Sequence, residues 1–487
     1  MYQFHNTGLP ILMISAGMLQ AKKVNNPAAT WHRYLNYGLL GLATRLQEHG
    51  YSPRVFHGHF DEPLSFVQNL HAAGRLDTSA PILLSVPSSY ALAWARKVCH
   101  AIKELRPSAK IVVGGRWVTA DDGQWVRKQL PGIDLVVYGT ADHFIHHLLD
   151  ASNWQKVVQA DMSIFPRIDA GQSEVLSRLD YRLLDGFDAF TPSFEVSRGC
   201  GRKCGFCAEG VVPLTTMKSA VALADEIEAC QAVYGDASIR AFFEASFFSP
   251  STDWISRLRN EFADRQISMK WRTETRVDNM APSQVRELAK AGLRVLDLGL
   301  ESASPQQLRH MKKTPNPTAY LRRASDLLKA CRDEGVWAKV NVLLYPGEDQ
   351  HSVSQTSEWL DQHADCIKGV SAGPLILYRY GQATCDFLNE IGSLGARPVS
   401  PGDLDSHGFT ELHLSASMSH EDAVGAASAL SRSVMSARDY FDLKSFSYFP
   451  RDLTFDQFSA SLSERNQANL PFAISSARRC AADMALQ

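Results

Sequence analysis

Three cysteines in one short loop are the residues of this chain most able to do metal chemistry. Cys200, Cys204 and Cys207 have the spacing C-x3-C-x2-C in a Gly-rich stretch. Thiolates are soft ligands that select zinc, copper(I) or iron-sulfur clusters. Structural zinc usually takes two pairs of Cys or His ligands, and the chain has no second C-x2-C. Three thiolates on a 4Fe-4S cluster would leave one iron open for a substrate, whereas a zinc site and a chance clustering stay as alternatives.

The segments that position this loop alternate between short apolar runs and helical stretches. The expected strands are Phe194–Ser197, Ile239–Phe243, Met269–Thr275, Val295–Leu300, Ala338–Leu344 and Leu375–Tyr378. The expected helices between them are Lys218–Val233, Asp253–Asp264, Pro282–Ala291, Thr318–Glu334 and Ser352–Gln362. Six strands with intervening helices predict a partial parallel (β/α)6 barrel.

Polar side chains gather where these barrel strands end. Glu244, Arg276, Glu301 and Ser302 follow or end expected strands, and Asn341 lies inside the fifth. In parallel barrels the reacting groups lie at the carboxyl ends of the strands. We therefore expect these residues on one rim with the cysteine loop, although a salt bridge on the surface is the simpler interpretation of Glu301.

An earlier part of the chain has the same alternation. Five expected strands, rich in Ile, Val and Leu, are Leu9–Ser15, Arg54–His57, Ile82–Val86, Lys110–Val113 and Leu135–Tyr138. With helices between them they predict an α/β, doubly wound sheet of flavodoxin type. Such sheets bind ligands at the carboxyl ends of their strands. There the chain has Ser85, Gly114, Gly115 and Gly139, small residues past which a flat ligand can approach the backbone.

These patterns divide the chain into four parts. We expect the doubly wound domain at 1–150, a connector without its own core at 151–192, the barrel at 193–380, and a mainly helical cap across the barrel mouth at 381–487. The cap is expected to hold helices at His420–Asp439 and Thr454–Gln467. Its aromatic residues are interpreted as packing. Cys385 follows the last expected barrel strand and is a candidate catalytic thiol, although a buried Cys usually acts as a small hydrophobe.

Composition sets outer limits on function. The 487 residues include 50 basic and 52 acidic side chains, so the net charge of −2 gives no footprint for nucleic acid or an anionic membrane. The N-terminal segment has no signal-peptide pattern and no membrane span. Nine cysteines, most of them scattered, disfavour a disulfide framework. We expect a cytoplasmic protein that binds neither nucleic acid nor membrane.

The cysteine loop resembles the cluster motif of the radical S-adenosylmethionine (SAM) enzymes, because an aromatic residue, Phe206, directly precedes the last Cys. The approach Ser197-Arg-Gly-Cys200 is similar to the branch of that superfamily with a cobalamin-binding domain. The resemblance implies that the three cysteines hold a 4Fe-4S cluster. Its open iron would chelate SAM, and an external reductant of flavodoxin or ferredoxin type would supply the electron that generates a 5'-deoxyadenosyl radical.

The resemblance extends along the barrel. Ala241-Phe-Phe-Glu-Ala-Ser-Phe247 resembles the second-strand segment in which an acidic residue, here Glu244 beside Ser246, meets the methionyl amine of SAM. Trp271 to Arg276 is similar to the third-strand motif. Leu298 to Ser302 resembles the fourth-strand motif, which implies SAM contacts for Glu301 and Ser302. Carboxylates suit an ammonium group and ribose hydroxyls, and an Arg suits a carboxylate.

The first domain resembles the cobalamin-binding domains of these enzymes, with best matches at Ala109–Gly115 and Asp134–Gly139. It departs from them at Gly139-Thr-Ala-Asp142, where the family usually has Gly-Glu-Gly-Glu, and it lacks the D-x-H-x-x-G axial-histidine motif. We expect Ser85, Gly114, Gly115 and Gly139 to form a corrin-accepting edge with no protein His below the cobalt. A histidine at His57 or His59 is more often a solvated turn residue than a ligand. A domain that binds no corrin is the alternative.

Two enzyme classes follow from these resemblances. The first is a cobalamin-dependent radical methyltransferase that acts on a carbon of a small-molecule or peptide substrate. The second is a radical dehydrogenase, deoxygenase or rearrangement enzyme without methyl transfer. A zinc-stabilised scaffold would leave Glu244, Arg276 and Glu301 unexplained. Substrate identity and oligomeric state have no signal in the sequence.

Overall fold

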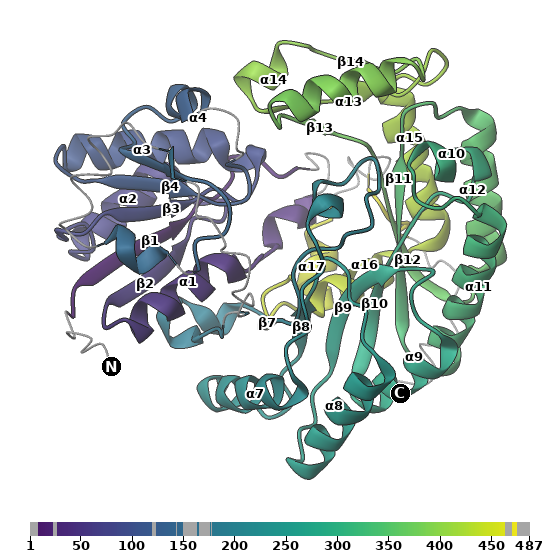
Figure 1. The fold of residues 1–487 in the computed structure, drawn as a ribbon, viewed down its shortest axis with the longest axis horizontal. Coiled ribbons are helices and arrows are strands. Elements are labelled where there is room, and N and C mark those ends of the chain that lie inside the picture. Colours follow the sequence, from purple (N-terminus) through teal and green to yellow (C-terminus); the bar gives the residue numbers. More distant parts are fainter. Residues whose placement is uncertain are drawn as a thin grey trace.

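The computed structural model describes residues 8–22, 27–118, 123–142, 144–149, 163–164, 176, 178–462 and 470–474. It has an α/β domain, a parallel barrel-like sheet beside it and a largely helical C-terminal region (Figure 1). This agrees with the expected fold class. No helix in the described part of the chain combines the length and the apolar character needed to cross a membrane.

The N-terminal domain is a six-stranded parallel sheet in the order β2-β1-β3-β4-β5-β6. Its strands are β1 (Pro10–Ser15), β2 (Ser52–His57), β3 (Ile82–Ser85), β4 (Ile111–Gly114), β5 (Leu135–Val137) and β6 (Ser163–Ile164). Strands β1, β3 and β5 are almost wholly buried because helices cover both faces of the sheet. Helices α1 (Tyr37–Glu48) and α5 (Ile145–Leu148) contact one another, as do α2 (Pro63–Ala72) and α3 (Leu92–Leu105), while α4 (Gly123–Gln129) precedes β5.

The five expected strands are all present, and the expected connector adds a sixth. Ser163 and Ile164 pair with Val136 and Val137. Two residues are too few for a periodic pattern, so the sequence gives no signal for this strand. Most of the rest of the expected connector, residues 151–162 and 165–175, lies outside the described residues.

The barrel-like sheet is also parallel and six-stranded, in the order β12-β11-β10-β9-β8-β7. Its strands are β7 (Ser193–Glu195), β8 (Ala241–Glu244), β9 (Trp271–Arg276), β10 (Leu293–Glu301), β11 (Trp337–Leu344) and β12 (Ile367–Pro374). Helices α7 (Ala220–Tyr234), α8 (Thr252–Asp264), α9 (Pro282–Lys290), α10 (Pro305–His310), α11 (Pro317–Asp333) and α12 (Gln350–Gln362) connect them. Because each strand is followed by a helix, the carboxyl ends of the strands meet on one rim.

The prediction of the sixth barrel strand is wrong. The strand is β12, and the segment expected in its place, Leu375–Tyr378, contributes β13 (Leu377–Tyr378), which pairs antiparallel with β15 (Phe409–Thr410). A lysine near the start of β12 hides the strand from a search for apolar runs. Lys368 is 2% exposed because its ammonium group binds Asp439 at 2.9 Å and Asp442 at 3.2 Å.

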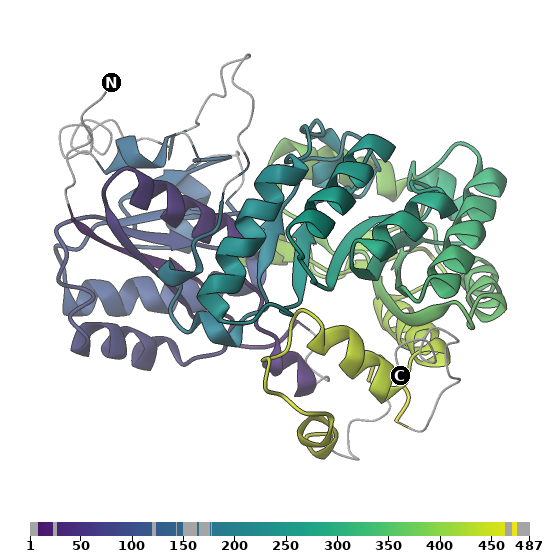
Figure 2. The same cartoon turned by 90° about the horizontal axis from the view of Figure 1, so that it is seen from below.

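The C-terminal region divides between the two ends of the barrel, so the expectation of one cap across the mouth is only partly right. Near the mouth, α13 (Gln382–Gly392) contacts the loop after α10 through the ion pair of Lys312 with Glu390. In contrast, α16 (Ala437–Ser445) and α17 (Phe455–Ala460) pack with Val295 and Trp337, at the starts of β10 and β11. These two helices form the yellow layer beside the barrel in Figure 2.

The expected helix His420–Asp439 is two helices, α15 (His420–Val434) and α16. Ser436 breaks it, because its backbone is extended and its hydroxyl accepts the N–H of Asp439 as the N-cap of α16. Within the expected helix Thr454–Gln467, α17 covers Phe455–Ala460 with Thr454 as its N-cap, and 463–467 lie outside the described residues. The aromatic residues around these helices form a buried cluster, as the packing interpretation predicts.

Candidate active site

The cysteine loop folds back on itself after β7. The N–H groups of Cys200 and Gly201 both donate to the carbonyl of Val212 at 2.9 Å, and that of Gly205 donates to Met311 at 2.9 Å. Gly199 has φ +72°, and a Cβ there would lie 2.1 Å from the carbonyl oxygen of Pro213. The glycine is therefore required for the loop to close.

The three cysteines of the loop are free thiols, each partly exposed. Burial raises the pKa of Cys207, and the nearby Cys204 and Cys200 add to the shift. Within the described residues, no three His, Cys, Asp or Glu side chains converge on one metal ion. In a 4Fe-4S cluster each thiolate binds a different iron, so the three sulfurs need not converge on a point. The soft donor set and its arrangement around one loop fit a cluster.

Arg276, at the end of β9, joins this loop to the rim. Its guanidinium donates to the sulfur of Cys204 at 3.4 Å, to Asp278 at 2.9 Å and to the carbonyl of Lys313 at 2.8 Å. Phe206 lies in the same corner, with the Lys313 ammonium 5.8 Å from its ring centroid. The structure thus brings Arg276 and Phe206 together with the cysteines.

Strand register divides the other predicted rim residues into two levels. Arg276 is paired with Gly299, which is paired with Asn341. One level deeper, Glu195 is paired with Glu244, and Asp297 with both Glu274 and Lys339. Because Phe243 is paired with Thr273, Glu244 lies level with Glu274. Glu244 is thus about 7 Å below the level of Arg276, since two residues of a strand rise by that much.

Glu301 carries a feature that the sequence does not reveal. It has φ +65°, in the left-handed region, at a register shift between β10 and β11. Its carboxylate binds Lys313 at 2.9 Å, and the lysine side chain is only 4% exposed. Non-glycine residues in this conformation cluster at functional sites. Lys313 belongs to the site, yet it lies in a loop after α10 where no periodic pattern could identify it.

The remaining predicted residues of the barrel are more dispersed. Ser302 is buried, and its hydroxyl lies 3.2 Å from that of Thr356 in α12 rather than at the open rim. Asn341 accepts a hydrogen bond from Lys339 at 2.9 Å. Ser246 donates to Glu209 at 3.2 Å. Cys385 is exposed on α13, and nothing in the described structure joins it to the cysteine loop.

Glu244 lies in a strongly acidic setting. The hydroxyl of Ser193 donates to its carboxylate at 2.7 Å. Burial raises the pKa of Glu244 to about 8, Ser193 opposes the shift, and the charges of Glu274 and Glu195 add to it. A cationic partner is the group that would stabilise this carboxylate.

At the N-terminal domain, Asn36 organises the carboxyl ends of three strands. Its amide donates to Ser15 and Ser85 at 3.0 Å each, and its backbone N–H donates to Nε2 of His57 at 2.9 Å. Its side-chain oxygen also caps α1. Sequence analysis missed Asn36, although an Asn just before a helical segment is a recognisable capping signal.

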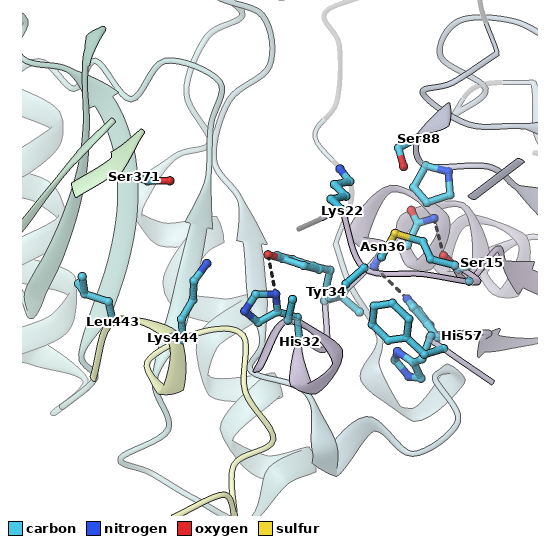
Figure 3. A pocket seen from close by; sticks show the side chains of 18 of the residues that line it. Ser15, Lys22, His32, Tyr34, Asn36, His57, Ser88, Ser371, Leu443 and Lys444 are labelled. Atoms are coloured by element: carbon cyan, nitrogen blue, oxygen red, sulfur yellow. Dashed lines mark hydrogen bonds between the residues drawn. The ribbon is translucent and has the colours of Figure 1, made fainter. Parts of the chain in front are cut away.

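A cavity of about 440 Å³ opens at this edge, between the two domains (Figure 3). Ser15–Met18, His57, His59, Pro87 and Ser88 line its N-terminal side, and Lys339, Ser371, Leu443 and Lys444 line the opposite side. Ser85, Gly114, Gly115 and Gly139 are not among its lining residues. Gly115 has φ +107°, and a Cβ there would lie 2.7 Å from the backbone of Val86, so the sheet itself requires this glycine.

The residues at this edge fit a corrin. Because a backbone N–H can only donate, Nε2 of His57 is an acceptor and Nδ1 carries the proton. That Nδ1 is buried and has no hydrogen-bond partner among the described residues. Burial lowers the pKa of His57 to about 3, so the ring stays neutral. His57 is therefore placed to donate a hydrogen bond to a ligand rather than to bind a metal.

Two ion pairs connect the cysteine loop to this domain. Arg198, just before Cys200, donates to Asp142 at 2.8 Å and to Glu195 at 2.8 Å. Arg116, just after β4, binds Glu209, just after Cys207. Asp142 stands in the segment where the sequence departs from the cobalamin-binding pattern, so that departure supplies the partner of Arg198.

Comparisons with known proteins agree with this geometry. The Radical SAM superfamily model matches residues 194–360, and the B12 binding domain model matches residues 32–149. Among solved structures, TsrM from Kitasatospora setae, a radical SAM methyltransferase, aligns with a TM-score of 0.64 at 16% identity, covering 88% of this chain and 90% of that one. The cobalamin-dependent SAM radical enzyme OxsB aligns with a TM-score of 0.63 at 12% identity, covering 90% and 68%. At these identities the likeness shows the fold.

The curated relatives match this chain over only part of their length. The tRNA-2-methylthio-N(6)-dimethylallyladenosine synthase of Ectopseudomonas mendocina (strain ymp) is 25% identical over 288 residues, 53% of this chain and 58% of that protein. The enzyme of the same name from Psychrobacter cryohalolentis is 27% identical over 289 residues, 52% of each chain. The chain thus spans little more than half the length of these relatives.

Proposed function

The chain belongs to the radical SAM superfamily, in the branch with a B12-binding domain, and from this premise we propose that it methylates a carbon of a small-molecule or peptide substrate. When bound, the cluster supplies the electron that cleaves SAM, and cobalamin supplies the methyl group. The observation that carries the proposal is the placement of the cysteine loop against the carboxyl edge of the B12-binding domain. Arg198 and Arg116 bridge the two.

In this proposal the rim residues bind and orient the cosubstrate. Arg276 pairs with the SAM carboxylate while it keeps its contact to Cys204. Glu301, held by Lys313, accepts hydrogen bonds from the ribose hydroxyls or the ammonium group. Asn341 supplies a neutral polar group at the level of Arg276, and Ser246 supplies another just after β8. Glu244 contributes negative potential to the ammonium group from the level below. Ser302 acts through its buried contact with Thr356, which holds the turn after β10.

The edge of the N-terminal domain is proposed to take the corrin. Ser85 holds the strand ends through Asn36, and Gly114 and Gly139 leave the edge open, since a Cβ at Gly114 would meet its nearest atom at 3.5 Å and one at Gly139 would meet none within 4 Å. Gly115 keeps the turn after β4 close to β3. His57, whose Nδ1 has no hydrogen-bond partner among the described residues, would donate a hydrogen bond to the bound corrin rather than serve as a metal ligand.

Anaerobic reconstitution tests this proposal. The full chain should take up iron and a corrin, both visible in one absorption spectrum, and should release 5'-deoxyadenosine from SAM when reduced. Replacing Cys200, Cys204 and Cys207 together by Ala should abolish the brown chromophore and the release. Stoichiometric zinc without iron would refute the cluster assignment. Deoxyadenosine release without corrin uptake would favour the radical redox or rearrangement class.

Methyl transfer has its own test. With a substrate in hand, each methylated product should consume two SAM molecules, one for the radical and one for the methyl group. One SAM per product without a mass gain of one methyl would refute methylation and leave the radical step intact. We propose an acidic flavodoxin or ferredoxin as the electron donor, and Cys385 stays a candidate for meeting a substrate radical if α13 closes over the mouth.

A further inference from the structure

Four neighbouring strands each place one carboxylate at the same depth inside the barrel. These residues, Glu195, Glu244, Glu274 and Asp297, are paired in sequence along β7, β8, β9 and β10. Directly paired residues of parallel strands point to the same face of a sheet. We call them the lumen carboxylates. Four carboxylates at one level need compensation when they are ionised, so the partner of each one is informative.

Cations neutralise two of the lumen carboxylates. Arg198 donates to Glu195 at 2.8 Å. Arg272 and Lys339 each bind Asp297 at 2.8 Å. Glu195 and Asp297 are therefore neutralised by cations of the protein and need no ligand.

The other two lumen carboxylates have no ion pair with a described residue, although the charge of Arg272 lowers the pKa of both. Glu244 has the hydroxyl of Ser193 as its hydrogen-bond donor. The carboxylate of Glu274 has neither a hydrogen bond nor an ion pair with any described residue. Glu274 is accessible to solvent; desolvation by the surrounding protein, followed by the charge of Asp297, raises its pKa to about 7, and the charges of Lys339, Arg272 and Arg116 oppose the shift. Glu274 is therefore a carboxylate with cations nearby but with no hydrogen-bond donor of its own among the described residues.

The position of Glu274 points to the substrate rather than to a cofactor. Two residues further along β9, Arg276 contacts Cys204, so Glu274 lies about 7 Å below the cysteine loop. Phe242, two residues before Glu244 on the same face, lies beneath it with its ring centroid 6.2 Å from that of Tyr448. On β9 the residue beneath Glu274 is Arg272, which is paired with Phe242 and lies 5.7 Å from its ring centroid. Glu274 thus lies between a floor formed by Arg272 and Phe242 and the level at which the radical chemistry is proposed.

A second group at this wall of the lumen also lacks a partner. Ser197 follows Glu195 by two residues, just past the end of β7, and its backbone N–H donates to the carbonyl of Glu244 at 3.5 Å. It is 3% exposed, and its hydroxyl has no hydrogen-bond partner among the described residues. A buried hydroxyl without a partner is unfavourable, and a ligand that carries polar groups would satisfy it.

We propose that Glu274 binds an amino group of the substrate, so that the substrate class is an amine whose carbon skeleton extends from Glu274 toward the cysteine loop. An ammonium group supplies N–H donors, which the described residues do not provide for this carboxylate, and it adds its positive charge to the more distant charges of Lys339, Arg272 and Arg116. The Phe242 ring of the floor would pack against an apolar part of the same molecule. The inference rests on the proposed function only in taking the lumen as the substrate site.

Calorimetry with a matched pair of probes tests whether Glu274 binds an amino group. The full-length, cluster-reconstituted protein without SAM is titrated at pH 8 with benzylamine and with benzyl alcohol, which are similar in shape and differ in charge. Benzylamine should bind at least about tenfold more tightly, a difference of about 1.4 kcal/mol. Glu274→Gln should abolish this preference, Glu274→Asp should retain it, and Glu358→Gln, on the outer face of α12, should leave it unchanged.

Equal affinity of the wild-type protein for the two probes, no binding of benzylamine, or a preference that survives in Glu274→Gln would each overturn the inference. Iron content and circular dichroism of each variant verify that it is folded. Deoxyadenosine release without substrate reports the proposed function separately. A protein that releases deoxyadenosine but shows no amine preference would refute only the inference, whereas the reverse result would refute only the proposed function.

Discussion

Replacing Glu301 by Gln leaves the ammonium group of Lys313 buried without a carboxylate. The lysine side chain is 4% exposed, and Glu301 is its partner at 2.9 Å, with the ring of Phe206 farther away at 5.8 Å. Removing one member of a buried ion pair typically costs about 3–5 kcal/mol. We therefore expect Glu301→Gln to lose about that much unfolding free energy, even though the change is almost isosteric.

The double variant separates stability from binding. Replacing Lys313 by Met together with Glu301→Gln removes both charges, and such replacements are often neutral. We expect the double variant to recover most of the lost free energy, with a coupling of at least about 2 kcal/mol. Urea unfolding of the protein without cofactors, followed by circular dichroism, measures each variant.

A loss below about 1 kcal/mol in Glu301→Gln, or a double variant no more stable than the single one, would refute this reasoning. If the double variant is stable, its affinity for SAM becomes informative. Loss of a partly buried charged contact costs about 2–5 kcal/mol, so we expect SAM to bind roughly tenfold more weakly or worse, by calorimetry. Unchanged affinity would remove Glu301 from the cosubstrate site.

Three further predictions follow from the same contacts. Gly115→Ala should destabilise the N-terminal domain by about 2–5 kcal/mol, because the new Cβ would lie 2.7 Å from the backbone of Val86 at φ +107°. As a control, Gly114→Ala should unfold like the wild type, because its Cβ would meet only ordinary contacts. Equal urea midpoints of unfolding for the two variants would contradict this prediction. Gly114→Trp, where the edge is open, should block corrin uptake without unfolding the domain, and normal corrin binding in the absorption spectrum would contradict the proposed edge. Burial raises the pKa of Glu348, which is 1% exposed, from 4.5 to about 7, so the folded state holds this proton more tightly than the unfolded state. The free energy of unfolding should therefore fall by up to about 3 kcal/mol as the pH rises from 4.5 to 7. Urea titrations at several pH values should show a smaller pH dependence for Glu348→Gln.

The fold could largely be predicted because most strands are apolar runs bounded by turns. The exceptions share one cause, which is stabilisation by partners distant in sequence. Lys368 makes β12 look like a surface segment, and its partners Asp439 and Asp442 lie about seventy residues later. No local pattern contains that information. The two-residue β6 depends in the same way on its neighbour β5.

Some residues of the candidate site could be predicted from the sequence and others could not. The three cysteines, Arg276 and Glu301 could be predicted because spacing and strand ends mark them. Lys313 and the pair formed by Arg198 and Asp142 could not, because their roles arise from contacts between distant segments. That position 115 requires a glycine could not be predicted from the sequence for the same reason. Its neighbours Val86 and Ser85 belong to another strand.

The ion pairs of Arg198 and Arg116 have a thermodynamic consequence for assembly. Each joins the cysteine loop to the carboxyl edge of the N-terminal domain, so ordering either side restricts the other. Linkage of this kind is reciprocal. If loading of the cluster tightens corrin binding by some factor, corrin must tighten retention of the cluster by the same factor. A shortage of either iron or cobalamin would then also weaken retention of the other group by that factor.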